Sequence, residues 1–142
     1  MLKSLSRVNF SSAFFVPRAG STTSFIKHYI MAYSEFLVDR VRQRLGHAGI
    51  TEEKKMMGGL ILMVNHKMCI GVDIDKRTNT DRLMVRVGKL PYEELLNVKG
   101  SRTMDFTGTV MRGFLFIDPD GFDTEEDLDF WTEKAIEFNR ML

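Results

Sequence analysis

The sequence is poor in the features that mark several classes of protein. It has one cysteine and three prolines in 142 residues, so it is neither a disulfide-stapled mini-protein nor a proline-rich linker. It has no run of about 18 apolar residues, so no transmembrane helix is expected. The formal net charge is only +1, which gives no overall attraction to nucleic acid or to an acidic membrane. With 44% hydrophobic and 27% charged residues, the composition is that of a globular domain.

The basic residues are unevenly distributed along the chain. Residues 1–30 contain four basic side chains, many serines and threonines and no acidic side chain, which is typical of an organellar presequence. We interpret residues 1–32 either as a flexible N-terminal extension or as a misassigned start before a natural Met31, and we favour an unstructured tail or a misassigned start over targeting. Residues 33–142 are expected to form the domain. The single thiol, Cys69, fits a cytoplasmic location, and a genuine presequence would make the location organellar.

Hydrophobic periodicity predicts a helix at each end of this domain. The first spans residues 34–45, with Ser34 as its N-cap. The second begins at Thr124, which has the capping-box spacing to Asp127. Its apolar stripe, expected to face the sheet, consists of Leu128, Trp131, Ala135, Phe138 and Leu142.

Between these helices the sequence predicts five strands and a short helix. The strands are expected near 60–64, 67–72, 83–87, 104–107 and 111–117. A hairpin turn is expected at Asn65-His66, and a short helix is expected to follow Pro91. The predicted fold class is α+β, with an antiparallel five-stranded sheet covered by the N- and C-terminal helices in the order α-βββ-α-ββ-α.

The sequence contains no arrangement of residues typical of a catalytic or metal-binding site. The three histidines do not have metal-ligand spacing to one another or to Cys69. His66 and Cys69 are expected to point to opposite faces of a strand, so they do not form a nucleophile pair. The aspartates at 73–75 and 118–120 lack the remaining ligands of a calcium loop. We therefore expect no enzyme activity, no metal and no cofactor.

Two surface features have more than one interpretation. A basic group formed by Arg40, Arg42, Arg44 and Lys54 could contact the phosphates of a nucleic acid, but neighbouring glutamates dilute it and a solvated helix face is preferred. Methionine is frequent, and seven methionines fall on or beside the predicted sheet: Met56, Met57, Met63, Met68, Met84, Met104 and Met111. We interpret most of them as core residues that fill gaps, and alternatively as an adaptable sheet face that binds a protein partner.

Several short motifs, in this order, resemble the N-terminal domain of the TfoX/Sxy family. They include a basic residue and methionines before a glycine pair, a Lys-Met after the predicted hairpin and a later Met-x-Gly. The motif residues are Lys55, Met57, Gly58, Gly59, Lys67, Met68, Met111 and Gly113. We expect the glycine pair to be structural and to pack closely where the connection from the first helix enters the sheet. His66 and Met57 stand where the family usually has glycine and phenylalanine.

The resemblance implies a fold similar to type III secretion chaperones and a role in competence regulation. The founding family members regulate natural competence together with a cyclic-AMP-responsive activator, and they carry a second, helical domain. We therefore expect a non-enzymatic regulatory or protein-interaction module whose partner is a protein, such as a transcription factor. The alternatives are a nucleic-acid-binding module and an unrecognised enzyme. Because secretion-chaperone-like domains often pair, Phe130 and Met141, opposite the apolar stripe, are a candidate homodimer contact.

Overall fold

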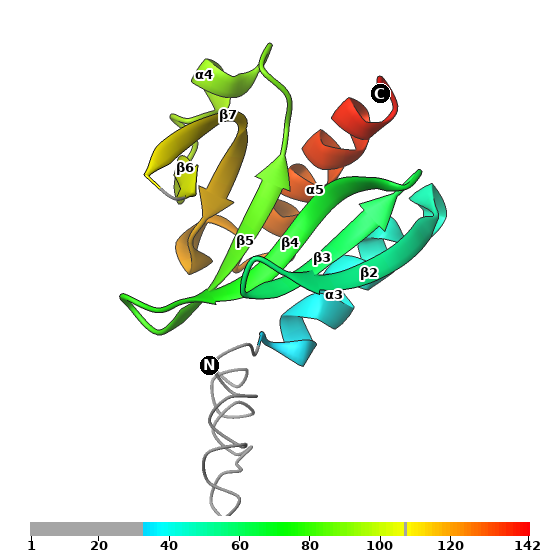
Figure 1. Cartoon of the computed structure of the whole chain (residues 1–142), viewed down its shortest axis with the longest axis horizontal. Helices are drawn as coiled ribbons and strands as arrows, with labels where there is room; N and C mark the ends of the chain where they lie inside the picture. Colours follow the sequence, from blue (N-terminus) through cyan, green and yellow to red (C-terminus); the bar gives the residue numbers. More distant parts are fainter. Residues whose placement is uncertain (1–32, 107) are drawn as a thin grey trace, which may run out of the picture.

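The computed structural model describes residues 33–106 and 108–142, and the expectations about residues 1–32 lie outside these ranges. The described elements are α3 (Glu35–Leu45), η1 (Gly46–Ala48), β2 (Ile50–Met56), β3 (Gly59–Val64), β4 (Lys67–Asp75), β5 (Thr80–Arg86), α4 (Tyr92–Leu95), β6 (Ser101–Phe106), β7 (Thr109–Ile117), η2 (Pro119–Gly121) and α5 (Glu125–Asn139). The helices α3 and α5 both lie behind the sheet in Figure 1, so they cover the same face. The α+β class is therefore confirmed. None of the described helices has the length and apolar character needed to span a bilayer.

The described strands form one antiparallel sheet in the order β2-β3-β4-β5-β7-β6. The prediction of five strands is wrong, because β2 is a sixth strand and precedes the others. All residues of β2 after Ile50 are exposed, and its centre reads Glu-Glu-Lys-Lys. A strand at the edge of a sheet with no apolar alternation gives no periodic signal. It is held by backbone pairing with β3, which a search for hydrophobic period does not detect.

Two-residue turns join β2 to β3 and β3 to β4. Asn65 and His66 have φ values of 55° and 62°, so the predicted hairpin turn with left-handed backbone is confirmed. Met57 and Gly58 have φ values of 58° and 80° and form the first of these turns. The glycine pair of the sequence therefore lies in a hairpin, and not where the connection from the first helix enters the sheet.

The predicted first helix is confirmed as α3. The Ser34 hydroxyl accepts a hydrogen bond from the Leu37 backbone N–H at 3.1 Å, as an N-cap does. After Leu45 the chain makes the 3₁₀ turn η1 and leaves it at Gly49, which has a φ of 86°. The residues that α3 buries against the sheet are Leu37, Val38, Val41 and Leu45.

The predicted C-terminal helix is confirmed as α5, although its apolar stripe ends earlier than expected. The Thr124 hydroxyl accepts from the Asp127 backbone N–H at 3.1 Å. The stripe is buried at Leu128, Trp131 and Ala135. Phe138 is only half-buried, and Leu142 lies beyond the end of the helix and is 47% exposed.

The last buried residue of α5 is polar. Asn139 is 4% exposed, and its side-chain amide donates to the Val64 carbonyl oxygen at 2.9 Å. Its side-chain oxygen accepts from the Asn65 amide, also at 2.9 Å. These two hydrogen bonds attach the end of α5 to the turn between β3 and β4.

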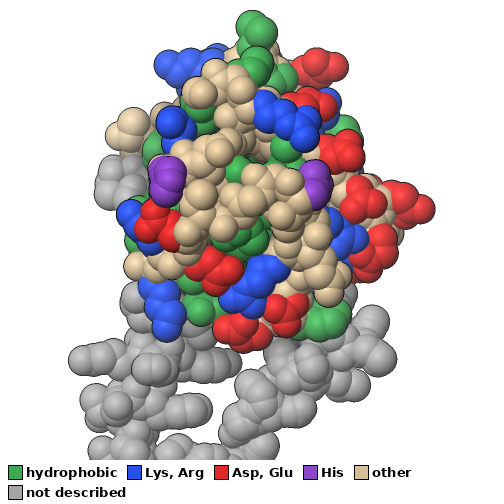
Figure 2. Space-filling view, turned by 90° about the vertical axis from the view of Figure 1, so that its right-hand side faces the viewer, with side chains coloured by type: hydrophobic (Ala, Val, Ile, Leu, Met, Phe, Trp, Pro, Cys, Tyr) green, Lys and Arg blue, Asp and Glu red, His purple; other side chains and the backbone are tan. Residues whose placement is uncertain are grey.

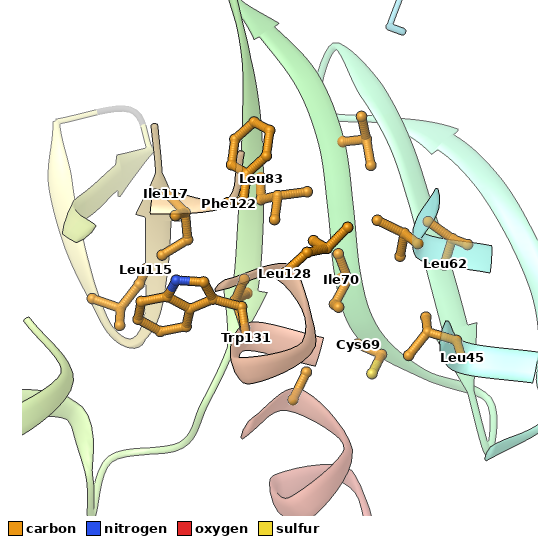
Figure 3. Packing of buried hydrophobic residues seen from close by; sticks show 14 of the residues in the cluster. Leu45, Leu62, Cys69, Ile70, Leu83, Leu115, Ile117, Phe122, Leu128 and Trp131 are labelled. Carbon is orange, nitrogen blue, oxygen red and sulfur yellow. The ribbon is translucent and has the colours of Figure 1, made fainter. Parts of the chain in front are cut away.

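The main core fills the space between the sheet and the two long helices. Figure 3 shows Trp131 of α5 beside Leu115 and Ile117 of β7. Trp131 is 1% exposed, and its indole N–H donates to the Gly121 carbonyl oxygen at 3.1 Å. This bond satisfies the one polar group of the largest side chain in the core.

Candidate functional site

A second apolar cluster lies on the face of the sheet opposite α3 and α5. Its buried members are Ile61, Met63, Met84, Met104 and Phe116. Partly buried residues that pack against it are Met57, Met68, Met111 and Phe114. Six of these nine residues are methionine, and all nine come from strands or from the first hairpin turn. The methionines that the sequence places on or beside the sheet therefore gather on one face.

A groove of about 400 Å³ opens over this cluster. Its floor includes Ile61, Met84 and Phe116, and Met56, which is 37% exposed, lines it as well. Pockets that bind ligands usually measure about 300–1,000 Å³. Unbranched methionine side chains adapt their shape to irregular partners. The groove therefore has both the size and the chemistry of a binding surface.

One wall of the groove is an arginine that lies flat on an aromatic ring. The guanidinium carbon of Arg82 is 3.7 Å from the centroid of the Phe116 ring. Its Nε and Nη2 atoms donate to the two carboxylate oxygens of Asp73 at 3.0 and 2.8 Å. Such a bidentate pair fixes the orientation of the guanidinium group. Arg82 is therefore both held in place and neutralised.

Asp75 extends this ion-pair network to β6. It is 3% exposed and lies 3.5 Å from Arg82 Nη1 and 2.8 Å from Arg102 Nη2. Arg102 also donates to both carboxylate oxygens of Asp118, at 2.8 and 2.9 Å. Burial raises the pKa of Asp75, but the Arg77 backbone N–H and the nearby guanidinium groups outweigh it and hold the pKa below its usual value. The charges around the groove therefore compensate one another.

The side chains of the family motif fall into two groups. Met57, Met68 and Met111 come from separate parts of the chain and pack around the second apolar cluster. Lys55 lies beside the start of β3, and Lys67 lies beside its end, and both are exposed. The structure therefore brings the motif methionines together and keeps the motif lysines apart.

The motif glycines allow turns and close packing. Gly58 has a φ of 80° in the first hairpin turn. A Cβ atom on Gly59 would lie 2.3 Å from the carbonyl oxygen of Val72, so β3 and β4 approach closely there. Gly113, with a φ of 95°, accepts a hydrogen bond from the Val87 backbone N–H at 2.8 Å. These contacts support a structural role for the glycine pair, although at a different place in the fold.

The arginines of the first helix form ion pairs within the chain. Arg40 lies 3.3 Å from Glu125 at the start of α5, and Arg44 also pairs with Glu125. Arg42 Nε lies 2.7 Å from Glu53 on β2. These pairs link α3 to its neighbours. The side chains of Arg40 and Arg44 are only 11% and 16% exposed, so this face is less solvated than the sequence suggests and takes part in the packing of the domain.

Lys54 lies on a different element from these arginines. Its side chain is 50% exposed, and its ammonium group is 3.8 Å from Glu52. Figure 2 looks onto the side of the molecule where β2 lies in Figure 1, and its acidic and basic side chains are interspersed. The four candidate nucleic-acid contacts therefore do not form one continuous basic surface on the side shown.

The candidate dimer residues lie on α5 and just after it. Phe130 is 36% exposed, and its ring meets the Trp131 ring edge-on with 5.0 Å between centroids. The Lys134 ammonium lies 5.4 Å from the Phe130 ring. Met141 is 69% exposed. Both residues reach the surface, and their role in a dimer stays a prediction.

The thiol and the hairpin histidine lie in different environments. Burial raises the pKa of Cys69 to about 11, although Arg86 lowers it slightly. His66 is 80% exposed on the second hairpin turn. His66 lies in the turn before β4 and not on the strand itself, so the two side chains occupy different environments. In the described part of the chain, no three histidine, cysteine or acidic residues are placed to hold a metal ion.

Sequence reasoning missed the charged network along the groove. It considers Asp73 and Asp75 only as incomplete calcium ligands and gives Arg82 and Arg102 no role. One signal was available, because Asp73 and Arg82 are placed symmetrically about the turn between β4 and β5 and pair directly across it. Arg102 comes from a distant strand, so its contact with Asp75 depends on the complete sheet.

Comparison with known proteins supports the resemblance found in the sequence. The family model described as TfoX N-terminal domain matches residues 43–139. This range includes all six strands of the sheet and nearly all of the chain after residue 42. A search of curated proteins and a search of solved structures found no match. The matched range covers more than half of the chain and every motif residue named above. The chain therefore belongs to the TfoX N-terminal domain family.

Proposed function

We propose that this chain is a non-enzymatic regulatory module that binds a protein partner through the methionine-rich face of its sheet. The observation that carries the proposal is the second apolar cluster, with its open groove, on the face opposite the two long helices. Family membership supports a regulatory role. The competence regulators that the chain resembles suggest a partner in transcription control.

The chemistry of the groove favours a protein over a small charged ligand. Its floor is apolar, whereas arginines and aspartates at its border neutralise one another. Protein interfaces have this arrangement, with an apolar centre, a polar rim and an enrichment in methionine, aromatic residues and arginine. Arg82 stacked on Phe116 gives the partner a flat and rigid contact. The methionines beside it can adapt to the partner's side chains.

The titratable groups support a non-enzymatic function. A general acid or base works best with a pKa near the working pH. Asp75 pairs with Arg82 and Arg102, which line the groove, and its pKa lies below its usual value, which keeps the carboxylate charged and paired. In the core, the raised pKa of Cys69 keeps its thiol protonated and unreactive. Neither pKa is shifted toward neutral pH.

A matched pair of variants tests the docking face. Met57→Asn removes an apolar side chain from the groove, and asparagine tolerates the left-handed backbone of this turn. His66→Asn introduces the same residue into the other hairpin turn, where His66 has a φ of 62°. This turn does not line the groove. Both variants should melt at temperatures close to that of the unmodified protein.

Each protein would be used to capture partners from a nuclease-treated native lysate, with quantitative mass spectrometry. We expect one specific protein whose recovery falls several-fold with Met57→Asn and is unchanged with His66→Asn. The purified partner should then shift the methyl NMR signals of Met57, Met84 and Met104. Equal recovery with both variants, or the absence of any specific protein, would contradict the proposed docking face. A partner that nuclease treatment removes would favour the nucleic-acid alternative.

A further inference from the structure

β2 gives the sheet a long exposed edge. It stands at one end of the strand order and, among the described strands, pairs only with β3. The residues that flank the two-residue turn between β2 and β3, Met56 and Gly59, form a hydrogen-bonded pair. Along antiparallel strands, hydrogen-bonded pairs alternate with pairs that are not hydrogen-bonded. The backbone N–H and C=O groups of Glu53 and Lys55 therefore point away from β3. No other strand in the described part of the chain pairs with these groups.

The charges of this edge complement themselves. Exposed edge strands often carry lysine, which discourages pairing with other chains. β2 also carries two lysines, but two acidic residues precede them, so the strand reads Glu52, Glu53, Lys54 and Lys55. When a second copy runs antiparallel, Glu52 of each copy can lie opposite Lys54 of the other. Opposite charges in directly facing positions stabilise a strand pair, and like charges destabilise it.

Symmetry restricts how two such edges can pair. A two-fold axis perpendicular to a continuous sheet places side chains of the same sheet face opposite each other. One residue of β2 therefore lies at the axis, directly opposite the same residue of the other copy. With Glu53 on the axis, Glu52 lies opposite Lys54 in the regular part of the strand, which follows the irregularity between Ile50 and Glu52. With Lys54 on the axis, two lysines would face each other and Glu52 would lie opposite Met56, so both Glu52–Lys54 pairs would be lost. The alignment centred on Glu53 is therefore favoured.

The structure already neutralises the residue on this axis. Glu53 accepts hydrogen bonds from Arg42 Nε at 2.7 Å and from Arg42 Nη2 at 2.8 Å. Its neighbour on β3 is Leu62, whose side chain belongs to the core under the helices. Two copies of Glu53 would thus face each other as arginine ion pairs on the helix-covered side, and not as bare carboxylates.

We propose that two copies of this chain associate through antiparallel β2 strands, with Glu53 at the two-fold axis, to form one continuous sheet. An axis perpendicular to the sheet places both methionine-rich faces on the same side. Met56 lines the groove of its own copy and belongs to the strand at the seam. The dimer presents two neighbouring grooves on one surface, and the pairing itself does not depend on what binds there.

Sedimentation equilibrium of the full chain, from low to high micromolar concentration, tests the association. Lys54→Glu replaces two attractive cross-strand pairs by repulsive ones, so we expect the Kd to rise by about tenfold or more. The double variant Glu52→Lys with Lys54→Glu restores opposite charges across the seam and should return the Kd to within about threefold of the original. Lys76→Glu, in an exposed turn, changes the net charge equally and should leave the Kd unchanged.

Disulfide cross-linking tests the alignment independently of the charges. Glu53→Cys places two thiols at the axis, where facing Cα atoms of a hydrogen-bonded pair are about 5.5 Å apart, within reach of a disulfide. Lys55→Cys is the matched control, because residue 55 does not lie opposite its own copy when Glu53 is on the axis. The native Cys69 is buried and should not react. We expect a covalent dimer from the first variant only.

The outcomes separate this interface from others. A monomer at high micromolar concentration, a dimer that Lys54→Glu leaves intact, or cross-linking through Lys55→Cys but not Glu53→Cys would each overturn the proposal. Dissociation by Phe130→Glu, with no effect of Lys54→Glu, would place the interface on α5 instead. Thermal melting followed by circular dichroism must show that each variant stays folded, so that dissociation is not a result of unfolding.

Discussion

Gly59 is the position where an added side chain has the clearest predicted cost. A Cβ atom there would lie 2.3 Å from the carbonyl oxygen of Val72 and 2.6 Å from the Cβ atom of Asp73. The first of these atoms belongs to the backbone of β4, so it cannot move aside by a side-chain rotation. Gly59→Val adds two methyl groups to this collision. The substitution must therefore push β3 away from β4 at this end of the pair.

The cost follows from the local packing. Overpacking of a well-filled site costs about 1–3 kcal/mol. Each backbone hydrogen bond lost between β3 and β4 adds about 1 kcal/mol. With one or two bonds lost, the free energy of unfolding should fall by about 2–5 kcal/mol. For a domain of this size, that corresponds to a Tm lower by about 8–20 °C.

Substitutions at two further glycines distinguish the stability cost of a steric collision from the cost of backbone strain. Gly58 has open space around it but a φ of 80°, so Gly58→Ala should cost only about 1–2 kcal/mol. Gly46 has open space and a helical φ of −55°, so Gly46→Ala should leave the Tm unchanged or raise it. Urea and thermal unfolding, followed by circular dichroism and Trp131 fluorescence, would give the ranking. A Gly59→Ala variant that is as stable as the original protein, or more stable than Gly58→Ala, would refute the close approach of the two strands.

Three other predictions concern buried polar and titratable groups. Asn139→Ala should lower the free energy of unfolding by about 1–3 kcal/mol, because the buried Val64 carbonyl loses its donor; an unchanged urea midpoint would contradict this. Cys69 should react slowly with a thiol reagent at pH 8 in the folded protein and rapidly in guanidinium, since burial raises its pKa to about 11; fast reaction of the folded protein would contradict it. The folded pKa of Asp75 lies below its unfolded value, so its contribution to stability is complete above about pH 4 and is lost as the pH falls further. Asp75→Asn should therefore lose less stability than the original protein between about pH 4 and pH 2, and parallel curves would exclude this contribution.

Local signals in the sequence were sufficient for the elements with their own chemistry. Ser34 and Thr124 cap the helices that their spacing predicts, because a cap involves residues only three positions apart. The turn at Asn65-His66 follows from two residues that tolerate left-handed backbone. These features depend on neighbours in the sequence, so they can be predicted without the fold.

The features that were missed depend on residues far apart in the sequence. β2 has no apolar period and is defined by its backbone pairing with β3. Asp75 meets Arg102 only because β6 joins the sheet through β7. The predicted apolar stripe on α5 is too long. Leu142 continues the helical spacing, but α5 ends at Asn139, which is hydrogen-bonded to Val64 beside the hairpin turn. In each case tertiary pairing, and not local preference, decides the structure.

The two faces of the sheet differ in a way that bears on function. Among the described residues, the cluster under α3 and α5 contains no methionine, and its sheet residues are leucine, isoleucine, valine and one cysteine. The opposite cluster has nine members, and six of them are methionine. Branched aliphatic side chains have few rotamers and hold the helices in one arrangement, whereas methionine fills irregular spaces and changes shape at little cost. If the methionines served only to fill gaps, they should occur on both faces. Met63, Met84 and Met104 are buried, as the interpretation as core expects. The accessible methionines on the same face, Met56, Met57, Met68 and Met111, favour an adaptable contact surface.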